Sequence, residues 1–149
     1  MSGSLVHSPA DVIRYLLVSL GLGTQPSARG SWPIYVANEP DSPDSVITVQ
    51  GTSGRQGGRL QVNGEIQEHQ GIQIRVRDAN HEDGYAKADT IKEVIDKSIR
   101  LNEVTIGSSV YLVWSVSRVG GIIELGKDVP DSKRDLFTLN AVVSLRQTT

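Results

Sequence analysis

The sequence predicts an α+β protein in which two helices pack on one face of a mostly antiparallel sheet that carries a long inserted loop. Apolar residues recur at helical spacing in residues 12–20 and again in residues 85–99. Residues 71–77 alternate apolar and polar side chains, which is the pattern of a half-buried strand. Other strand-like segments follow one another with only these helices between them. That order favours helices gathered on one side of an antiparallel sheet.

Both helices have clear starting signals. Ser8 can accept a backbone N–H and Pro9 suits the first helical position, so the first helix is expected to begin there. It is expected to end before Gly21. Asn80 can cap the second helix, which is expected over residues 81–99. The apolar stripe of this helix consists of Tyr85, Ala88, Ile91, Ile95 and Ile99.

Strands are expected at residues 33–36, 45–50, 71–77, 110–119, 122–125 and 136–146. The segment 38–44, between the first two, is rich in Pro, Asp and Ser and therefore predicts a turn. Trp114 alternates with Leu112 and Val116, which places it in the predicted core. The helices are expected to pack on the sheet through Leu16, Leu20, Ile91 and Ile95 on one side and Ile74, Leu112 and Leu139 on the other.

Residues 51–70 are expected to form a mobile loop. They are rich in glycine and in amide side chains, a composition typical of loops. A loop of about twenty residues inside a compact domain is usually functional or disordered. Bulky apolar residues are few, so ordering is expected only against a partner that buries Leu60, Val62 and Ile66.

Composition limits the classes of function. The chain has 149 residues, a formal net charge of -2 at pH 7 and no cysteine. This length suggests a single domain over residues 1–149, with residues 1–7 as an N-terminal tail. The charge gives no basic field for nucleic acid, and the lack of cysteine excludes disulfides and thiol chemistry. No apolar run approaches the length of a transmembrane helix, and residues 12–22 make a poor signal peptide.

The sequence shows no pattern of catalytic or metal-binding residues. His7, His69 and His81 are far apart and are interpreted as solvated surface residues. Residues 51–59 resemble a phosphate-binding loop only in glycine content, because the Gly-Lys-Ser/Thr ending and the following helix are missing. No catalytic residue, metal ligand or cofactor is therefore expected.

Charged residues near the predicted turn are candidates for contacts between subunits. Asp41 and Asp44 fit turn chemistry better than a calcium loop, because the regular spacing of oxygen ligands is absent. Arg75 and Arg77 project from one face of their strand. That face could be plain solvent surface, a contact between subunits, or the wall of a channel for nucleic acid. Trp32 follows a polar loop and is a further interface candidate.

Several segments together resemble a known family. Residues 34–44, Ile-Tyr-Val-Ala-Asn-Glu-Pro-Asp-Ser-Pro-Asp, are the most specific part, and residues 72–77 and 125–128 add to it. Over roughly residues 33–144 the chain resembles the minor capsid or tail-terminator proteins of long-tailed bacteriophages. Further matching positions are Ile47, Val49, Thr52, Gly54, Tyr85, Ala86, Ala88, Ile91, Phe137, Asn140 and Val143, whereas Gln50, Gly51 and Asp78 depart from the pattern.

The resemblance implies a virion structural protein without enzymatic activity. Such proteins form hexameric rings that cap the tail tube and meet the head connector at the tail–neck junction, after assembly in the host cytoplasm. The implied partners are further copies of the chain, the tail tube protein and the connector or neck protein, with passive contact to DNA in the lumen and no membrane. The alternatives are another head–tail completion protein of the same fold and a small phosphate-binding enzyme. The expected interface residues are Trp32, Asp41, Asp44, Arg55, Arg59, Leu60, Val62, Ile66, Arg75 and Arg77.

Overall fold

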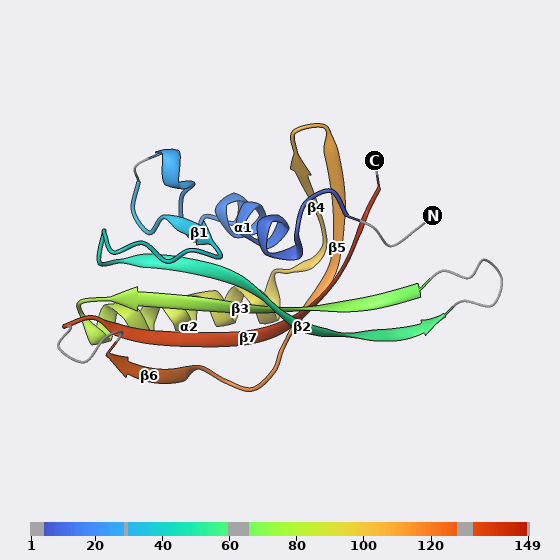
Figure 1. The fold of residues 1–149 in the computed structure, drawn as a ribbon. Helices are drawn as coiled ribbons and strands as arrows, with labels where there is room; N and C mark the ends of the chain where they lie inside the picture. Colours follow the sequence, from blue (N-terminus) through green and yellow to red (C-terminus); the bar gives the residue numbers. More distant parts are fainter. Residues whose placement is uncertain (1–4, 29, 60–65, 128–132, 149) are drawn as a thin grey trace.

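The computed structural model describes residues 5–28, 30–59, 66–127 and 133–148 (Figure 1). The helices are α1 (Pro9–Ser19) and α2 (His81–Lys97), with a short 3-10 helix at Pro26–Ala28. The strands are β1 (Ile34–Val36), β2 (Val46–Arg59), β3 (Ile66–Asp78), β4 (Arg100–Ile106), β5 (Ser109–Arg118), β6 (Ile123–Lys127) and β7 (Asp135–Gln147). Within these ranges no helix is long and apolar enough to cross a membrane.

The strands form one curled sheet. Its order is β1-β2-β3-β7-β5-β4, and β6 pairs with β7 beside this path, which makes seven strands in the described part of the chain. β1 and β2 run parallel, and the other described pairs are antiparallel. The α+β class with a mostly antiparallel sheet is therefore confirmed. The sequence did not predict β4, and the turn at residues 38–44 joins two parallel strands.

Both predicted helix starts are confirmed. The Ser8 hydroxyl accepts from the Asp11 backbone N–H at 3.1 Å, with Pro9 as the first helical residue. The Asn80 side chain accepts from the Asp83 backbone N–H at 3.0 Å. These contacts satisfy donors that have no partner within the helix itself, so local sequence fixes where each helix begins.

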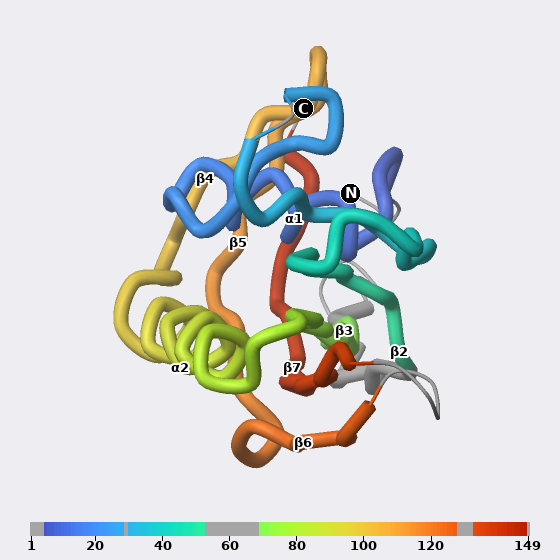
Figure 2. The backbone as a smooth tube through the Cα atoms, turned by 90° about the vertical axis from the view of Figure 1, so that its left-hand side faces the viewer, coloured from blue at the N-terminus to red at the C-terminus, as the bar shows by residue number. Residues whose placement is uncertain are grey.

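One hydrophobic core joins both helices to one face of the sheet, which we call the inner face. Ile74 of β3 lies opposite Val49 of β2 and Leu139 of β7, and all three are buried. Side chains of α1 and α2 complete this cluster, and the sheet curls around them (Figure 2). The predicted core is confirmed for Leu16, Ile91, Ile95, Ile74 and Leu139, and Leu20 packs at its margin.

The prediction that Trp114 and Leu112 belong to the core is wrong. Tyr111 and Val113 are fully buried, whereas Trp114 is 39% exposed and Leu112 is only partly buried. β5 and β7 change register between Val113 and Ser115, which interrupts the alternation in the middle of β5. Both faces of this strand carry bulky apolar residues, so the alternation alone could not tell which face meets the core.

The prediction of an unstructured loop over residues 51–70 is wrong for most of that segment. β2 continues to Arg59 and β3 begins at Ile66. Arg55 lies opposite His69 and Arg59 opposite Ile66 in an antiparallel pair. The pairing shifts register twice, and such irregularities allow a glycine-rich sequence to stay extended. A glycine-rich composition therefore did not prevent the backbone of this segment from pairing.

Residues 52–59 and 66–69 form a two-stranded ribbon, which we call the β2–β3 ribbon. It projects beyond the rest of the molecule at the right of Figure 1. β3 pairs with β7 only from Gln70 onward, so the described pairing of the ribbon is between its own two strands. The predicted contact residues Leu60 and Val62 lie outside the described residues, and their role stays a prediction.

Candidate assembly surfaces

Arg77 holds the turn at residues 38–44 on the face of the sheet opposite the core, the outer face. Its side chain is 2% exposed. The guanidinium donates from Nη2 to the Pro43 carbonyl at 2.8 Å and from Nε to the Asp44 carbonyl at 3.3 Å. Hydrogen bonds from a charged donor are stronger than those between neutral groups. Arg77 is therefore buried within its own subunit, and its expected place near a subunit or lumen surface stays a prediction.

Arg75 lies one step along the same face and forms a looser contact with the turn. Its Nη2 is 3.5 Å from Oε2 of Glu39, and both side chains are mostly buried. Arg75 Nε, Glu39 Oε1 and the hydroxyl of Thr48 are buried without a hydrogen-bond partner in the described structure. Thr48 lies opposite Arg75 in the sheet. This polar cluster ties the turn to β2 and β3, although its hydrogen-bonding capacity is only partly used.

A basic residue of the same chain, Arg134, contacts the turn at a backbone carbonyl and at one of its two aspartate carboxylates. Arg134 donates from Nη1 to the Asp41 carbonyl and lies 3.6 Å from Oδ1 of Asp44. Asp41 and Asp44 themselves are exposed. The Asp44 carboxylate thus has a basic partner within its own subunit, and a contact of the two exposed aspartates with a neighbouring subunit stays a prediction.

Trp32 lies on the margin of the core and is half-buried. The Lys87 ammonium of α2 lies over the Trp32 ring, 5.4 Å from the ring centre. A cation over an aromatic face is attracted by the ring electrons. Burial lowers the pKa of Lys87 below its ordinary value. The ring is therefore occupied by its own subunit on one side, and an interface role for Trp32 stays a prediction.

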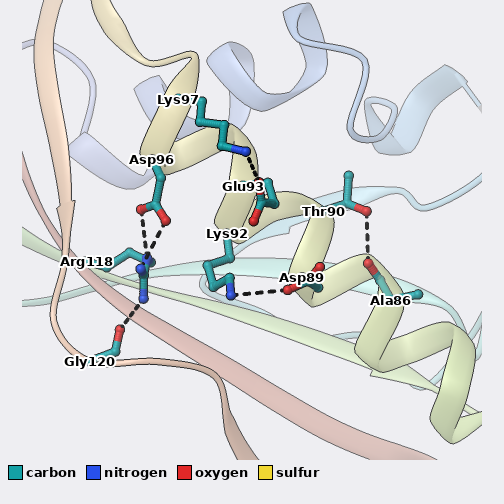
Figure 3. A network of polar contacts seen from close by, with 9 residues as sticks. All are labelled: Ala86, Asp89, Thr90, Lys92, Glu93, Asp96, Lys97, Arg118 and Gly120. Carbon is teal, nitrogen blue, oxygen red and sulfur yellow. Dashed lines mark hydrogen bonds and ion pairs between the residues drawn. The ribbon is translucent and has the colours of Figure 1, made fainter.

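The outward side of α2 is covered by ion pairs, drawn in Figure 3. Arg118, at the end of β5, donates to both carboxylate oxygens of Asp96 at 2.8 and 3.0 Å, and to the Gly120 carbonyl at 2.7 Å. The hydrogen bond from Arg118 lowers the pKa of Asp96 and raises that of Arg118. Lys97 pairs with Glu93 at 2.6 Å. The bidentate contact between Arg118 and Asp96 fastens the end of α2 to the turn before β6.

The histidines join separate elements. Their interpretation as solvated surface residues is corrected for His7 and His69, which are partly buried, and is confirmed for His81. His7 lies 2.7 Å from the Tyr111 hydroxyl through Nδ1, and His69 lies 2.9 Å from the Ser144 hydroxyl. His81 is exposed but meets Glu124 at 2.7 Å. No group of His, Asp or Glu that could hold a metal ion is found in the described part of the chain.

The N-terminal segment is attached to the end of the sheet at residues 5–7. The Val6 backbone N–H donates to the Gln147 side chain at 2.9 Å, and the His7 N–H donates to the Tyr111 hydroxyl at 2.9 Å. Leu5 packs against the core. The remainder of the predicted tail, residues 1–4, lies outside the described residues.

Two groups of exposed apolar residues were not expected from the sequence. In β6, Ile123 is 44% and Leu125 is 50% exposed. On β4 and β5, Leu101 and Trp114 are exposed. The Arg146 guanidinium lies 5.5 Å from the Trp114 ring centre. Isolated apolar side chains are common on surfaces. On a sheet edge such as β6 they instead favour the addition of another strand.

Comparison with known protein families supplies the decisive observation. A family model described as bacteriophage tail terminator protein matches residues 16–145. The chain belongs to the bacteriophage tail terminator family. No curated protein matches it. The match begins within the last part of α1, ends within β7, and includes the turn, β1 to β6 and α2, so it covers most of the tail terminator fold seen here.

Membership of this family settles the broad role of the protein. Tail terminators are structural and not enzymatic, which removes the phosphate-binding enzyme from consideration. This tail terminator is a component of the phage virion tail and contacts the tail tube. The resemblance seen in residues 34–44 and 72–77 is thereby confirmed. The turn of the first segment and the arginines of the second are the same parts that the structure joins on the outer face.

Proposed function

We propose that copies of this tail terminator form a closed hexameric ring, which caps the finished tail tube and joins it to the head connector or neck protein. The ring would lie at the tail–neck junction of particles assembled in the host cytoplasm. The family match supports a place at the end of the tail. The proposal of a ring rests mainly on the β2–β3 ribbon, which projects beyond the rest of its own subunit.

A closed ring requires that each subunit present two different surfaces that fit each other. The subunit has two dissimilar ends. The β2–β3 ribbon projects at one end, and β6 lies at the lower left in Figure 1, away from the ribbon tip. A head-to-tail contact between unlike ends of successive copies produces a ring when the rotation closes.

The ribbon is suited to ordering on a partner. A two-stranded ribbon is at best marginally stable in water by itself, because few side chains are buried between two strands. Its backbone can extend the sheet of a neighbour or of the tail tube, and we expect such a partner to bury Leu60, Val62 and Ile66. Binding would offset the loss of chain entropy, which is about 1–2 kcal/mol for each ordered backbone residue.

Three uncharged amide residues on the outer face form a polar patch that suits passive contact with DNA in the lumen. Gln50, Gln73 and Asn140 lie side by side across β2, β3 and β7. The Gln73 amide donates to the Asn140 side chain at 3.2 Å. Amide groups carry no net charge, so they would hold phosphates weakly and allow DNA to slide past.

Removal of the ribbon tests the function. Residues 54–68 are deleted in the phage that encodes the chain, and tails are measured by electron microscopy. The shortened subunit is expected to fold. The tails are expected to be irregular in length and to lack heads. Tails of normal length that fail to join heads would indicate another head–tail completion protein. Tails of normal length that join heads would overturn the assembly role of the ribbon. The exposed substitution Arg100→Ala is the matched control.

A further inference from the structure

The free edge of β6 has the features of an acceptor for another strand. In the described part of the chain β6 pairs only with β7, and every one of its residues is exposed. Ile123 and Leu125 are the large apolar side chains on this strand. An unpaired edge with apolar side chains offers both backbone hydrogen bonds and a surface to bury.

β2 also has a free edge, which could supply the strand that pairs with β6. β1 pairs with β2 only at residues 47–49. Beyond that point, residues 50–59 pair with β3 on one side, and no described strand lies on the other. The free stretch is longer than β6, so the whole of β6 can be matched. Main-chain hydrogen bonds of this kind tolerate a glycine-rich sequence, because they need no particular side chain.

The two edges differ in charge. Residues 50–59 contain Arg55 and Arg59 and no acid. β6 carries Glu124, whose carboxylate meets His81 of α2 at 2.7 Å, and the two residues after His81, Glu82 and Asp83, are exposed acids. Lys127 of β6 is paired with Asp135 at 3.0 Å. Opposite charges on two surfaces favour their encounter and reject wrong pairings.

We propose that the free edge of β2 in one copy adds to the free edge of β6 in the next copy of this chain. The sheet of each subunit is thereby extended by a strand from its neighbour. The ribbon and β6 lie at different ends of the subunit (Figure 1), so the contact is head-to-tail and passes from copy to copy. This inference rests on the proposed ring, and it names the two strands that close it.

Cross-linking in assembled virions tests the pairing, because the chain has no cysteine of its own. Gln56→Cys on β2 is combined with Leu125→Cys on β6, and a short bis-maleimide linker removes the need for one exact register. The control combines Gln56→Cys with Thr105→Cys on β4, which also has a free edge in the described structure. The substituted residues on β6 and β4 are exposed, so folding is preserved.

The expected result is a ladder of linked chains in the Gln56–Leu125 virions and unlinked chains in the Gln56–Thr105 virions. If electron microscopy shows the ring but the ladder is absent, or appears only with Thr105, this pairing is wrong and the proposed function stands. If the virions contain no ring of this chain, the proposed function fails and the pairing fails with it.

Discussion

Arg77 donates a hydrogen bond from its buried guanidinium to the carbonyl oxygen of Pro43 at 2.8 Å. The two residues are far apart in the sequence and come from β3 and from the turn before β2. The contact makes the turn part of the folded subunit, so its exposed aspartates are presented in a fixed position. The shape of this surface therefore depends on a residue that no neighbour can touch.

Arg77→Ala is expected to lower the free energy of unfolding by about 2–4 kcal/mol, because two carbonyls lose a charged donor inside the structure. Urea denaturation followed by circular dichroism measures the change. Arg100→Ala, an exposed arginine on β4, is the control and should change stability by about 0.5 kcal/mol or less. Equal effects of the two substitutions would contradict the role of Arg77 as a clamp.

Ile74→Asp is expected to cost several kcal/mol, because a carboxylate would be buried between Val49 and Leu139 with no partner. Urea denaturation, or the loss of soluble protein, reports the effect. Thr52→Asp on the exposed part of β2 is the matched control and should leave the subunit folded. A soluble Ile74→Asp variant as stable as the wild type would refute the core assignment.

Truncation of Phe137 should cost much more stability than truncation of Trp114, although the tryptophan is the larger residue. Phe137→Ala is expected to cost about 3–5 kcal/mol, because the ring is buried against α2. Trp114→Ala should cost only about 1 kcal/mol or less, since the ring is exposed and loses mainly its contact with Arg146. The midpoints of urea unfolding compare the two. A larger loss of stability at Trp114 than at Phe137 would show that Trp114 belongs to the core.

The Asp96 carboxylate should titrate below the usual range, because Arg118 donates to it. A group whose folded pKa is lowered stabilises the fold above its unfolded pKa, and this contribution is lost as pH falls through the folded pKa. Carboxyl NMR titration is expected to show a lowered pKa of Asp96 in the wild type and a return toward the ordinary aspartate pKa in Arg118→Ala. An unchanged pKa in that variant would show that the contact is not made in solution.

Local signals predicted some parts of this fold and failed where distant residues decide. Ser8 and Asn80 were identified correctly because a helix cap needs only its own first turn. β4 escaped prediction because its apolar residues are few and most of its positions are exposed. The position of Trp114 depends on a register change against β7, which a single strand does not reveal.

The contacts at the candidate surfaces also depend on residues that are distant in the sequence. The segment at residues 34–44 led to the right family, yet the partners of its acids could not be derived from it. Arg134 reaches Asp41 and Asp44 from the other end of the chain. The exposed edge of β6 likewise becomes visible only when the sheet order is known. Residues 51–59 were expected in a loop because glycine content reports on side chains, whereas strand pairing uses the backbone.

Electron cryomicroscopy of the tail–neck junction tests the central claim most directly. The virion of the phage that encodes this chain is imaged, and density for the chain is located between the last ring of the tail tube and the head connector. A single closed hexameric ring at that place is the expected result. Copies of the chain located elsewhere in the virion, or arranged there without closing into a ring, would contradict it.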